Sequence, residues 1–476
     1  MALRKGVGVV DLDLAFSSAG QIARRVASRE LSPVEVVANS LARIAEVNPK
    51  LNCFAFVWDE EAKRAAESAA QAIARGEAVG PLHGVPVALK DTTPTAGHRT
   101  TLGSYTHEHW VPDRDAYIVG ALRRAGAIIV GKTTTPEFAH TLVTDSPLWG
   151  VTRNPWNLDR TPGGSSGGSG AAVASGCVPL AEGSDMGGSV RIPASWCGVV
   201  GLKPGLGRIP MDTLPGLFDS ISHLGPIARS VDDARLFLAA TQGPDDADIL
   251  SIPCPLDLSE PVSPSVEGLR LGLSIDLGYV AVEPAVEAAV RAAAAALQNA
   301  GAVVTQVDIR MSPKDDDVWL DLWGVFMAGY FGHLVEQYRD RMDPDVLSLI
   351  ERGNKLSAVH VKRLELARTD LWRRLAPVLA DHNAILCPTM AQGPPPTAKA
   401  NRPPPPPDDG RFHTPDMTGV FNLVAPCPAL SVPCGWDPDG LPIGLQIVGR
   451  RWREDTVLQI GRAVEVAMPQ TRRPPL

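Results

Sequence analysis

Residues 161–194 read TPGGSSGGSGAAVASGCVPLAEGSDMGGSVRIPA, a run rich in Gly and Ser with few charged side chains. On composition alone, such a run is typical of a flexible connection or of a nest of backbone N–H groups that binds an anion. Its glycines also allow the backbone to pass close to other chain segments, because they carry no Cβ atom. The meaning of the run therefore depends on the sequence around it.

On both sides of this run, the chain alternates helical and strand-like segments. Upstream, the apolar run Val85–Leu89 suits a buried strand, and a helical pattern over Tyr117–Arg124 leads into a strand at Ala127–Val130. Downstream, an Ala-rich helix at Val286–Asn299 leads into strand-like residues at 303–309. The alternation predicts an α/β fold: one large domain with a mixed, mostly buried β-sheet surrounded by helices.

The overall composition excludes several classes of protein. The 476 residues are 44% hydrophobic and 21% charged, which is typical of a globular protein with a large core. A formal net charge of −8 provides no basic surface for nucleic acid or an anionic membrane. We expect no membrane-spanning helix, because no window reaches the roughly 18 apolar residues that one needs. Asp11 and Asp13 interrupt the first apolar run, so we expect no secretory signal.

The cysteines indicate the compartment. There are seven, they are scattered, and none forms a C-x-x-C pair. An odd, scattered set fits a reducing environment better than a disulfide framework or a zinc site. We therefore expect a cytoplasmic protein.

Three short patterns suggest other functions and are set aside. Residues 126–133, GAIIVGKT, match a phosphate-binding loop, but the four residues between the glycines are strand-like and cannot curl round a phosphate. The pattern G-x-S-x-G occurs twice within 163–168, but a hydrolase elbow also needs a downstream acid and His. None of the ten histidines lies in a helpful context, and residues 107–109, HEH, lack the spacing of a zinc protease.

Several segments together resemble the amidase signature family. They include the run at 161–194 and residues 84–91 (GVPVALKD), 100–104, 225–231 and 428–433, with shorter matches at 43–44, 48–52, 137–138 and 440–442. Their order, and the spacing between Lys90, Ser165 and Ser189, match the family over most of the chain. The resemblance implies the amidase signature fold and hydrolysis of linear amides through an acyl-enzyme, with no metal and no cofactor. Some members also cleave esters or carbamates.

The resemblance implies a Ser–cis-Ser–Lys triad. By position, Ser189 is the nucleophile, Ser165 the bridging serine on a cis peptide bond, and Lys90 the base. A serine hydroxyl becomes a good nucleophile only when a base takes its proton, so Lys90 must be neutral when it acts. Burial lowers the pKa of a lysine, and the apolar run before Lys90 supplies such a setting. Asp91 is adjacent, but on a strand its side chain would point to the opposite face.

The resemblance also assigns a role to the loop before Ser189. Its backbone N–H groups would stabilise the oxyanion of a tetrahedral intermediate, each by roughly 2.7–4 kcal/mol. The donors are those of Met186, Gly187, Gly188 and Ser189. The residues expected to hold this loop are Ser166, Asp185 and Arg191. Ser184 departs from the family's usual Thr but keeps the hydroxyl group.

The remaining parts of this single domain, 1–476, carry less specific signals. We divide it into N-terminal helices (1–80), a catalytic core (81–260), a helical segment of the substrate region (261–390), a Pro-rich loop (391–415) and a C-terminal return to the core (416–476). The Pro-rich loop is extended, and it acts as a solvated linker or as a cap over the site.

The substrate region carries one aromatic stripe at helical spacing, which either packs in the core or forms an apolar pocket wall for an aryl or alkyl substrate. Its members are Trp319, Trp323, Phe326 and Tyr330. The expected partner is a small-molecule amide or carbamate. The sequence leaves the oligomeric state open between a monomer and a homodimer.

Two functions compete with a stand-alone amidase. One is the glutaminase subunit of a tRNA-dependent amidotransferase, which shares the triad. That class commonly has a GKTNMDEF segment where residues 131–138 here read GKTTTPEF, and an aromatic stripe suits a glutamine pocket poorly. The other is a degenerate binding protein, which the three intact triad positions disfavour.

Overall fold

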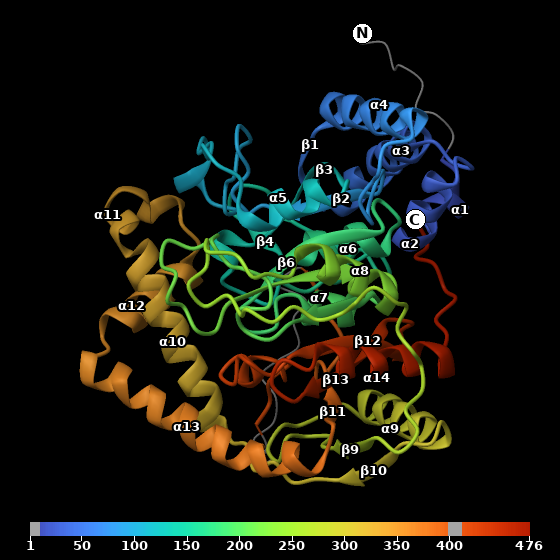
Figure 1. Cartoon of the computed structure of the whole chain (residues 1–476). Helices are drawn as coiled ribbons and strands as arrows, with labels where there is room; N and C mark the ends of the chain where they lie inside the picture. Colours follow the sequence, from blue (N-terminus) through green and yellow to red (C-terminus); the bar gives the residue numbers. More distant parts are fainter. Residues whose placement is uncertain (1–9, 398–411) are drawn as a thin grey trace.

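The computed structural model describes residues 10–397 and 412–476. An eleven-stranded β-sheet runs through its centre (Figure 1). In spatial order its strands are β1 (Phe54–Val57), β3 (Ile128–Thr133), β2 (Pro86–Lys90), β6 (Leu180–Asp185), β8 (His223–Ala228), β7 (Val200–Lys203), β12 (Ala429–Trp436), β13 (Pro442–Gly449), β11 (Ala384–Pro388), β9 (Arg270–Leu273) and β10 (Val303–Gln306). A separate two-stranded sheet pairs β4 (Asp145–Ser146) with β5 (Gly150–Val151).

The large sheet is mixed. Strands β3, β2 and β6 are parallel neighbours towards one edge, and β11, β9 and β10 are parallel at the other. The strands between β6 and β11 are antiparallel. Every residue of β2, β3, β8 and β13 is buried, as expected for strands covered on both faces. The predicted α/β class with a mixed, mostly buried sheet is confirmed.

Helices cover both faces of this sheet. Those of the first half of the chain are α1 (Leu12–Ala15), α2 (Ala19–Ala27), α3 (Pro33–Leu51), α4 (Asp59–Arg75), α5 (Tyr117–Arg124), α6 (Gly167–Ala174), α7 (Arg191–Cys197) and α8 (Val231–Thr241). Those of the second half are α9 (Pro284–Asn299), α10 (Pro313–Phe331), α11 (Val335–Tyr338), α12 (Pro344–Asn354), α13 (Ala358–Asp381) and α14 (Glu454–Ala467). Helices α9 and α14 pack against β12, and α3 and α4 pack against β3. Helix α10 contacts both α12 and α13, and the three helices gather at one side of the sheet (Figure 1).

Local sequence signals explain several element ends. Ser32 caps α3 with its side chain, Glu35 completes the capping box, and Pro33 occupies the first turn. Helix α5 has the predicted bounds, and the left-handed Gly126 follows its C-cap. Strand β10 ends at Gln306, so the predicted strand at 303–309 is too long.

Strand β3 contains residues 128–133 of the segment that matches a phosphate-binding loop. Gly131, Lys132 and Thr133 are part of the strand and buried, and the Lys132 Nζ donates to the Thr93 carbonyl oxygen (2.8 Å). The segment is therefore a strand, as predicted, but it continues to Thr133, past the predicted end at Val130. Of the Pro-rich loop, residues 398–411 lie outside the described residues. Just before them, Pro396 forms an isolated antiparallel bridge with Arg160.

One helical stretch bears on the expectation that no helix spans a membrane. By length and mean hydropathy alone, Pro313–Arg341 could span a membrane. This is weak evidence, because the core helix of a soluble protein passes the same test. Within the stretch, Trp323, Phe326 and Met327 belong to a buried cluster that includes Phe138 and Val346.

Candidate active site

Lys90 is the last residue of β2 and is fully buried. Its Nζ donates to the Ser165 Oγ (2.6 Å) and to the Ser184 Oγ (2.9 Å). The structure therefore brings two of the three predicted triad residues into direct contact. It adds a second hydroxyl, that of Ser184, at the position where the family usually has Thr.

The surroundings of Lys90 favour its neutral form. Burial lowers the pKa of Lys90 to about 7, and the negative charges of Glu182 and Asp185 oppose this shift. The carboxyl group of the neighbouring Asp91 accepts a hydrogen bond from the Thr101 N–H (3.0 Å). Its negative charge acts on Lys132, where burial lowers the pKa and the charge of Asp91 opposes that shift. With its lowered pKa, Lys90 can accept a proton near neutral pH.

Ser165 and Ser189 line one cavity of about 230 Å³ together with Ser184. Ser165 is buried, and the peptide bond between Gly164 and Ser165 is cis, as the resemblance implies. Ser189 precedes α7 and is half-buried. Within residues 10–397 and 412–476, its hydroxyl makes no hydrogen bond to protein, so its Oγ is free to meet a substrate.

The loop before Ser189 is held in place by hydrogen bonds that its carbonyl oxygens accept from other segments of the chain. The Met186 carbonyl oxygen accepts from the Trp319 Nε1 (2.8 Å), and the Gly187 carbonyl oxygen accepts from the Thr418 Oγ1 (2.6 Å). Because the C=O and N–H of a trans peptide point in opposite directions, the N–H of Gly187 points away from Trp319. The Gly188 carbonyl oxygen accepts from the Ile192 N–H (2.7 Å), which directs the Ser189 N–H in the same manner. In the part of the chain that the structure describes, the N–H groups of Met186, Gly187 and Ser189 have no protein acceptor.

Gly188 corrects the predicted set of oxyanion donors. Its N–H donates to the Asp185 Oδ1 (2.8 Å), so this donor is already engaged. The Asp185 side chain folds back over its own loop and so reaches this N–H. Its Oδ2 also accepts from the Val190 N–H (3.3 Å). The position still requires Gly, because its φ is +119° and a Cβ atom there would lie 1.8 Å from the Thr418 Oγ1.

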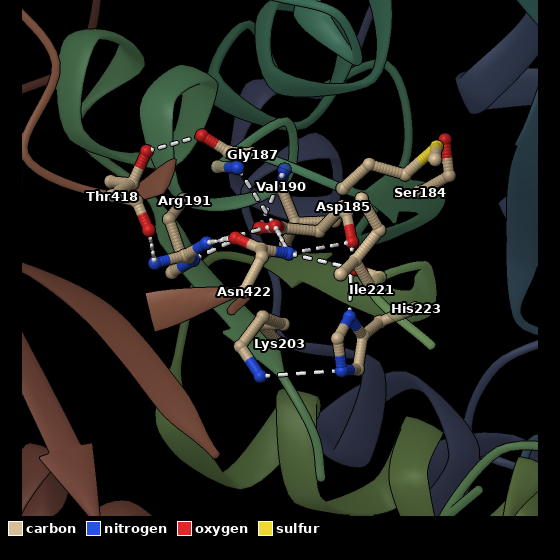
Figure 2. Close-up of polar contacts among 12 residues, drawn as sticks. Ser184, Asp185, Gly187, Val190, Arg191, Lys203, Ile221, His223, Thr418 and Asn422 are labelled. Atoms are coloured by element: carbon tan, nitrogen blue, oxygen red, sulfur yellow. Dashed lines mark hydrogen bonds and ion pairs between the residues drawn. The ribbon is translucent and has the colours of Figure 1, made fainter. Parts of the chain in front are cut away.

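Asp185 and Arg191 form a fully buried, bidentate ion pair behind this loop (Figure 2). The Arg191 Nε donates to Oδ2 (2.9 Å) and Nη2 to Oδ1 (2.8 Å). Burial alone would raise the pKa of Asp185, but the charge and hydrogen bonds of Arg191 hold it well below its usual value. Ser166 contributes through its main chain, whose N–H donates to the Ser189 carbonyl oxygen (3.2 Å).

Distant segments complete the support of Arg191, and the sequence analysis missed them. Asn422 accepts from the Arg191 Nη2 (2.6 Å), and Gln446 accepts from Nη1 (2.6 Å). The Asn422 Nδ2 also donates to the Asp185 carbonyl oxygen (3.1 Å), as Figure 2 shows. No local motif connects these positions, because they approach the loop only in the folded sheet.

The predicted aromatic stripe is divided between two cavities. Trp319 and Trp323 line the catalytic cavity. Phe326 and Tyr330 line a neighbouring cavity of about 610 Å³. The two cavities share the wall residues Ala139, Ser184 and Met186. The sequence alone does not assign these aromatic side chains to a cavity, because distant segments form the other walls of both cavities.

Two acidic residues of the site were also missed. Asp416 lines the catalytic cavity, where its Oδ1 accepts from the Thr418 N–H (2.7 Å). Glu182 is fully buried behind Lys90 and accepts from its main-chain N–H (2.8 Å). A signal for Glu182 existed, since it is the one charged residue between Thr161 and Ser184.

A group of potential metal ligands lies beside the catalytic cavity. His140, Asp343 and Asp345 place one ligand atom each within 4.8 Å of one another. Asp345 is exposed, and exposed acidic groups are common without an ion. The group carries no metal assignment.

Comparisons with known proteins agree with this geometry. The amidase family model matches residues 35–458. An acylamidase of Rhodococcus erythropolis is 36% identical over 98% of both chains. The structure of a bacterial aryl acylamidase of the amidase signature family superposes with a TM-score of 0.91 at 29% identity, covering 96% of this chain and 97% of that one.

The chain belongs to the amidase signature family of amide hydrolases. The resemblance read from residues 84–91 and 161–194 is thereby confirmed. The family also includes glutamyl-tRNA(Gln) amidotransferase A subunits. That of a Cyanothece species is 34% identical over 97% of this chain and all of its own.

Proposed function

We propose that this protein cleaves the C–N bond of small apolar amides through an acyl-enzyme on Ser189. Ser165 relays the proton and Lys90 is the base. The observation that carries the proposal is the buried contact between the Lys90 Nζ and the Ser165 Oγ (2.6 Å), beside a cavity that both serines line. A neutral lysine can accept a proton through Ser165, because a hydroxyl both accepts and donates.

The reaction then proceeds in two acyl-transfer steps. The Ser189 Oγ attacks the substrate carbonyl carbon, its proton passes to Ser165, and the Ser165 proton passes to the Lys90 Nζ. The oxyanion binds to the N–H groups of Gly187 and Ser189. Collapse of the intermediate breaks the C–N bond, and the amine leaves with the proton returned through Ser165. Water repeats the sequence on the acyl-enzyme and releases the acid and Ser189.

The two cavities support an apolar substrate with a bulky arm. The scissile carbonyl lies in the cavity with Ser189, against Trp319 and Trp323. The larger cavity, lined by Phe326 and Tyr330, accepts an aryl or alkyl group past the shared Met186 wall. Carbamates and esters present the same carbonyl group, so we include them among the substrates. The relatives named acylamidase and aryl acylamidase favour the same class.

The glutaminase alternative has less support. The amidotransferase subunits match this chain about as well in sequence as the acylamidase does. A glutamine side chain leaves most of the aromatic wall without a partner, however, and a buried apolar surface favours an apolar ligand. We therefore propose a stand-alone cytoplasmic enzyme. Its free cysteines, six of them buried, agree with a reducing compartment.

A matched substrate panel tests the proposal. It contains an aryl anilide, an aliphatic amide, a p-nitrophenyl ester, an aryl carbamate and glutamine. Wild type is compared with Ser189→Ala and with the control Ser348→Ala, whose exposed hydroxyl bonds the Pro344 carbonyl oxygen of its own helix (3.0 Å). We expect anilide cleavage that the control retains and that Ser189→Ala reduces at least about 1,000-fold. Cleavage of glutamine alone would assign the chain to the amidotransferase class.

The larger cavity is tested within the same panel. Phe326→Ala opens the wall of that cavity without touching the serines. We expect kcat/KM for the anilide to fall about 10-fold or more, while that for a short aliphatic amide stays within a factor of two. Equal losses for both substrates would contradict the assignment of the cavity.

A further inference from the structure

Glu182 lies at the point where strands β2 and β6 separate. The two strands pair through Val87 with Leu180 and through Ala88 with Ala181. Beyond that pair, the Glu182 Oε2 accepts the Lys90 main-chain N–H (2.8 Å). A side-chain carboxyl group therefore accepts the Lys90 main-chain N–H, in place of the main-chain carbonyl oxygen that strand pairing would supply.

The hydrogen bonds of this carboxyl group are incomplete. Oε2 also accepts from the Thr93 Oγ1 (2.9 Å), while Oε1 is buried with no hydrogen-bond partner in the described residues. Burying a carboxyl oxygen without a partner costs free energy. A leucine at this place would avoid that cost, so the acidic group is expected to have a function.

The charges around Lys90 indicate what that function is. The Lys90 Nζ donates to two neutral hydroxyl groups, and the carboxylates acting on it are Glu182 and Asp185. Asp185 is already engaged in the bidentate pair with Arg191. Glu182 makes no ion pair in the described residues. Among those residues, no counter-charge at ion-pair distance therefore offsets the effect of its carboxylate on Lys90.

The other charged groups near Glu182 come from the neighbouring strands. Lys132 of β3 acts on Glu182, but its Nζ donates to the Thr93 carbonyl oxygen and to the Thr100 hydroxyl. Asp91, which follows β2, is among the groups that act on Lys132. Lys90 and Lys132 are therefore the two lysines whose positive charges act on the Glu182 carboxyl group.

We propose that Glu182 is a positioning residue of the reaction, which fixes the Lys90 main chain and stabilises the Lys90 ammonium group formed when the base takes the proton. This inference rests on the proposed role of Lys90. The ammonium exists in the same intermediate as the substrate oxyanion. Burial raises the pKa of Glu182, while the hydrogen bonds from the Lys90 N–H and Thr93 and the charges of Lys90 and Lys132 oppose that rise. In its ionised form the carboxyl group behind Lys90 stabilises that intermediate without binding substrate. No bond to Glu182 forms or breaks.

Glu182→Gln tests the charge, because the amide keeps an acceptor for the Lys90 N–H. The control Thr93→Val removes the other hydrogen bond to Oε2 and keeps the carboxyl group. The measurements are kcat/KM for an anilide from pH 5 to 10, and the rate at which a fluorophosphonate labels Ser189 over the same range. Without the negative charge Lys90 loses its proton more easily, so we expect the acidic limb of both profiles to move down by about one pH unit. The plateau rate should fall about 10-fold, and Thr93→Val should keep the wild-type limb.

Glu182→Asp separates the charge from the geometry and serves as a second variant if the Gln protein folds poorly. It keeps the charge on a shorter side chain, so the limb should stay at the wild-type pH while the plateau falls. A wild-type limb and plateau in Glu182→Gln, or a shifted limb in Glu182→Asp, would overturn the inference about Glu182 alone. Full activity of Lys90→Ala would instead overturn the proposed function.

Discussion

The Trp319 indole donates its N–H to the Met186 carbonyl oxygen at 2.8 Å, and so connects the wall of the catalytic cavity to the loop that precedes Ser189. A Cβ atom on Gly187 would lie 2.3 Å from the same indole ring. The helix that carries the proposed substrate wall therefore also holds the loop of the proposed oxyanion donors.

Trp319→Phe keeps the wall and removes this hydrogen bond. We expect kcat to fall about 5- to 10-fold, because the bond contributes roughly 1 kcal/mol to the orientation of the loop. KM for a short amide should change little. The control is Trp323→Phe, which loses a bond from Nε1 to the His140 carbonyl oxygen (3.2 Å) and does not touch the loop. Equal effects of both variants on kcat would contradict the prediction, and steady-state kinetics decides it.

The rate should depend on the protonation of Lys90. Its pKa is lowered to about 7, and only the neutral amine accepts a proton. The value of kcat/KM should therefore rise with pH, reach half its plateau near pH 7 and stay high above pH 8. The profile is measured with an anilide that does not ionise in this range. A flat profile from pH 6 to 9 would argue against a titrating lysine.

Ser184 gives Lys90 its second hydrogen bond, at 2.9 Å. Ser184→Ala should lower kcat/KM about 10- to 100-fold, because a hydrogen bond to a charged group is worth about 1.5–3 kcal/mol. Ser184→Thr keeps the hydroxyl and should retain most of the activity. If the Thr variant lost as much as the Ala variant, side-chain volume and not the hydroxyl would explain the effect.

Asp185→Asn should destabilise the fold. The substitution leaves the Arg191 guanidinium buried without its counter-charge, which costs about 3–5 kcal/mol. Urea unfolding followed by fluorescence measures this loss. Asp317→Asn is the control, because its side chain is exposed and at most loosely paired. A loss below 1 kcal/mol would mean that the buried pair contributes little to stability.

Stability should rise with pH above neutrality, partly because of Lys203. This lysine lies beside His223, near the Asp185–Arg191 pair (Figure 2), and burial lowers its pKa to about 7. Its unfolded pKa is about 10.4, so between these values the unfolded chain binds a proton that the folded chain does not. The free energy of unfolding should therefore increase from pH 7 to 8.5. Lys203→Met should flatten that increase, and an unchanged slope would contradict the shift.

Local motifs in the sequence predicted much of the fold and the first contacts of the site. The apolar run Val85–Leu89 predicted the strand that ends at Lys90, and the resemblance to the amidase signature family implied that Lys90 and Ser165 act together. The capped start of α3 and the bounds of α5 follow from residues within each segment. Where the sequence left two readings of the aromatic stripe, core packing or pocket wall, the structure contains both.

The remaining features depend on contacts between distant segments. Thr418 and Asn422 reach the loop before Ser189, and Gln446 reaches Arg191, from more than 200 residues away. The engagement of the Gly188 N–H depends on a side-chain rotation of Asp185, which no spacing predicts. Glu182 contacts Lys90 at the point where strands β2 and β6 stop pairing, and only the folded sheet shows where that pairing ends.

The most direct test of the central claim is to trap the acyl-enzyme. The protein is mixed with an aryl carbamate or a p-nitrophenyl ester, quenched in acid within one turnover, and analysed by mass spectrometry of the intact chain and of its peptides. The account predicts a mass increase equal to the acyl group, located on Ser189, in wild type and in neither Ser189→Ala nor Lys90→Ala. An acyl group on another residue, or full turnover by Ser189→Ala, would contradict the account.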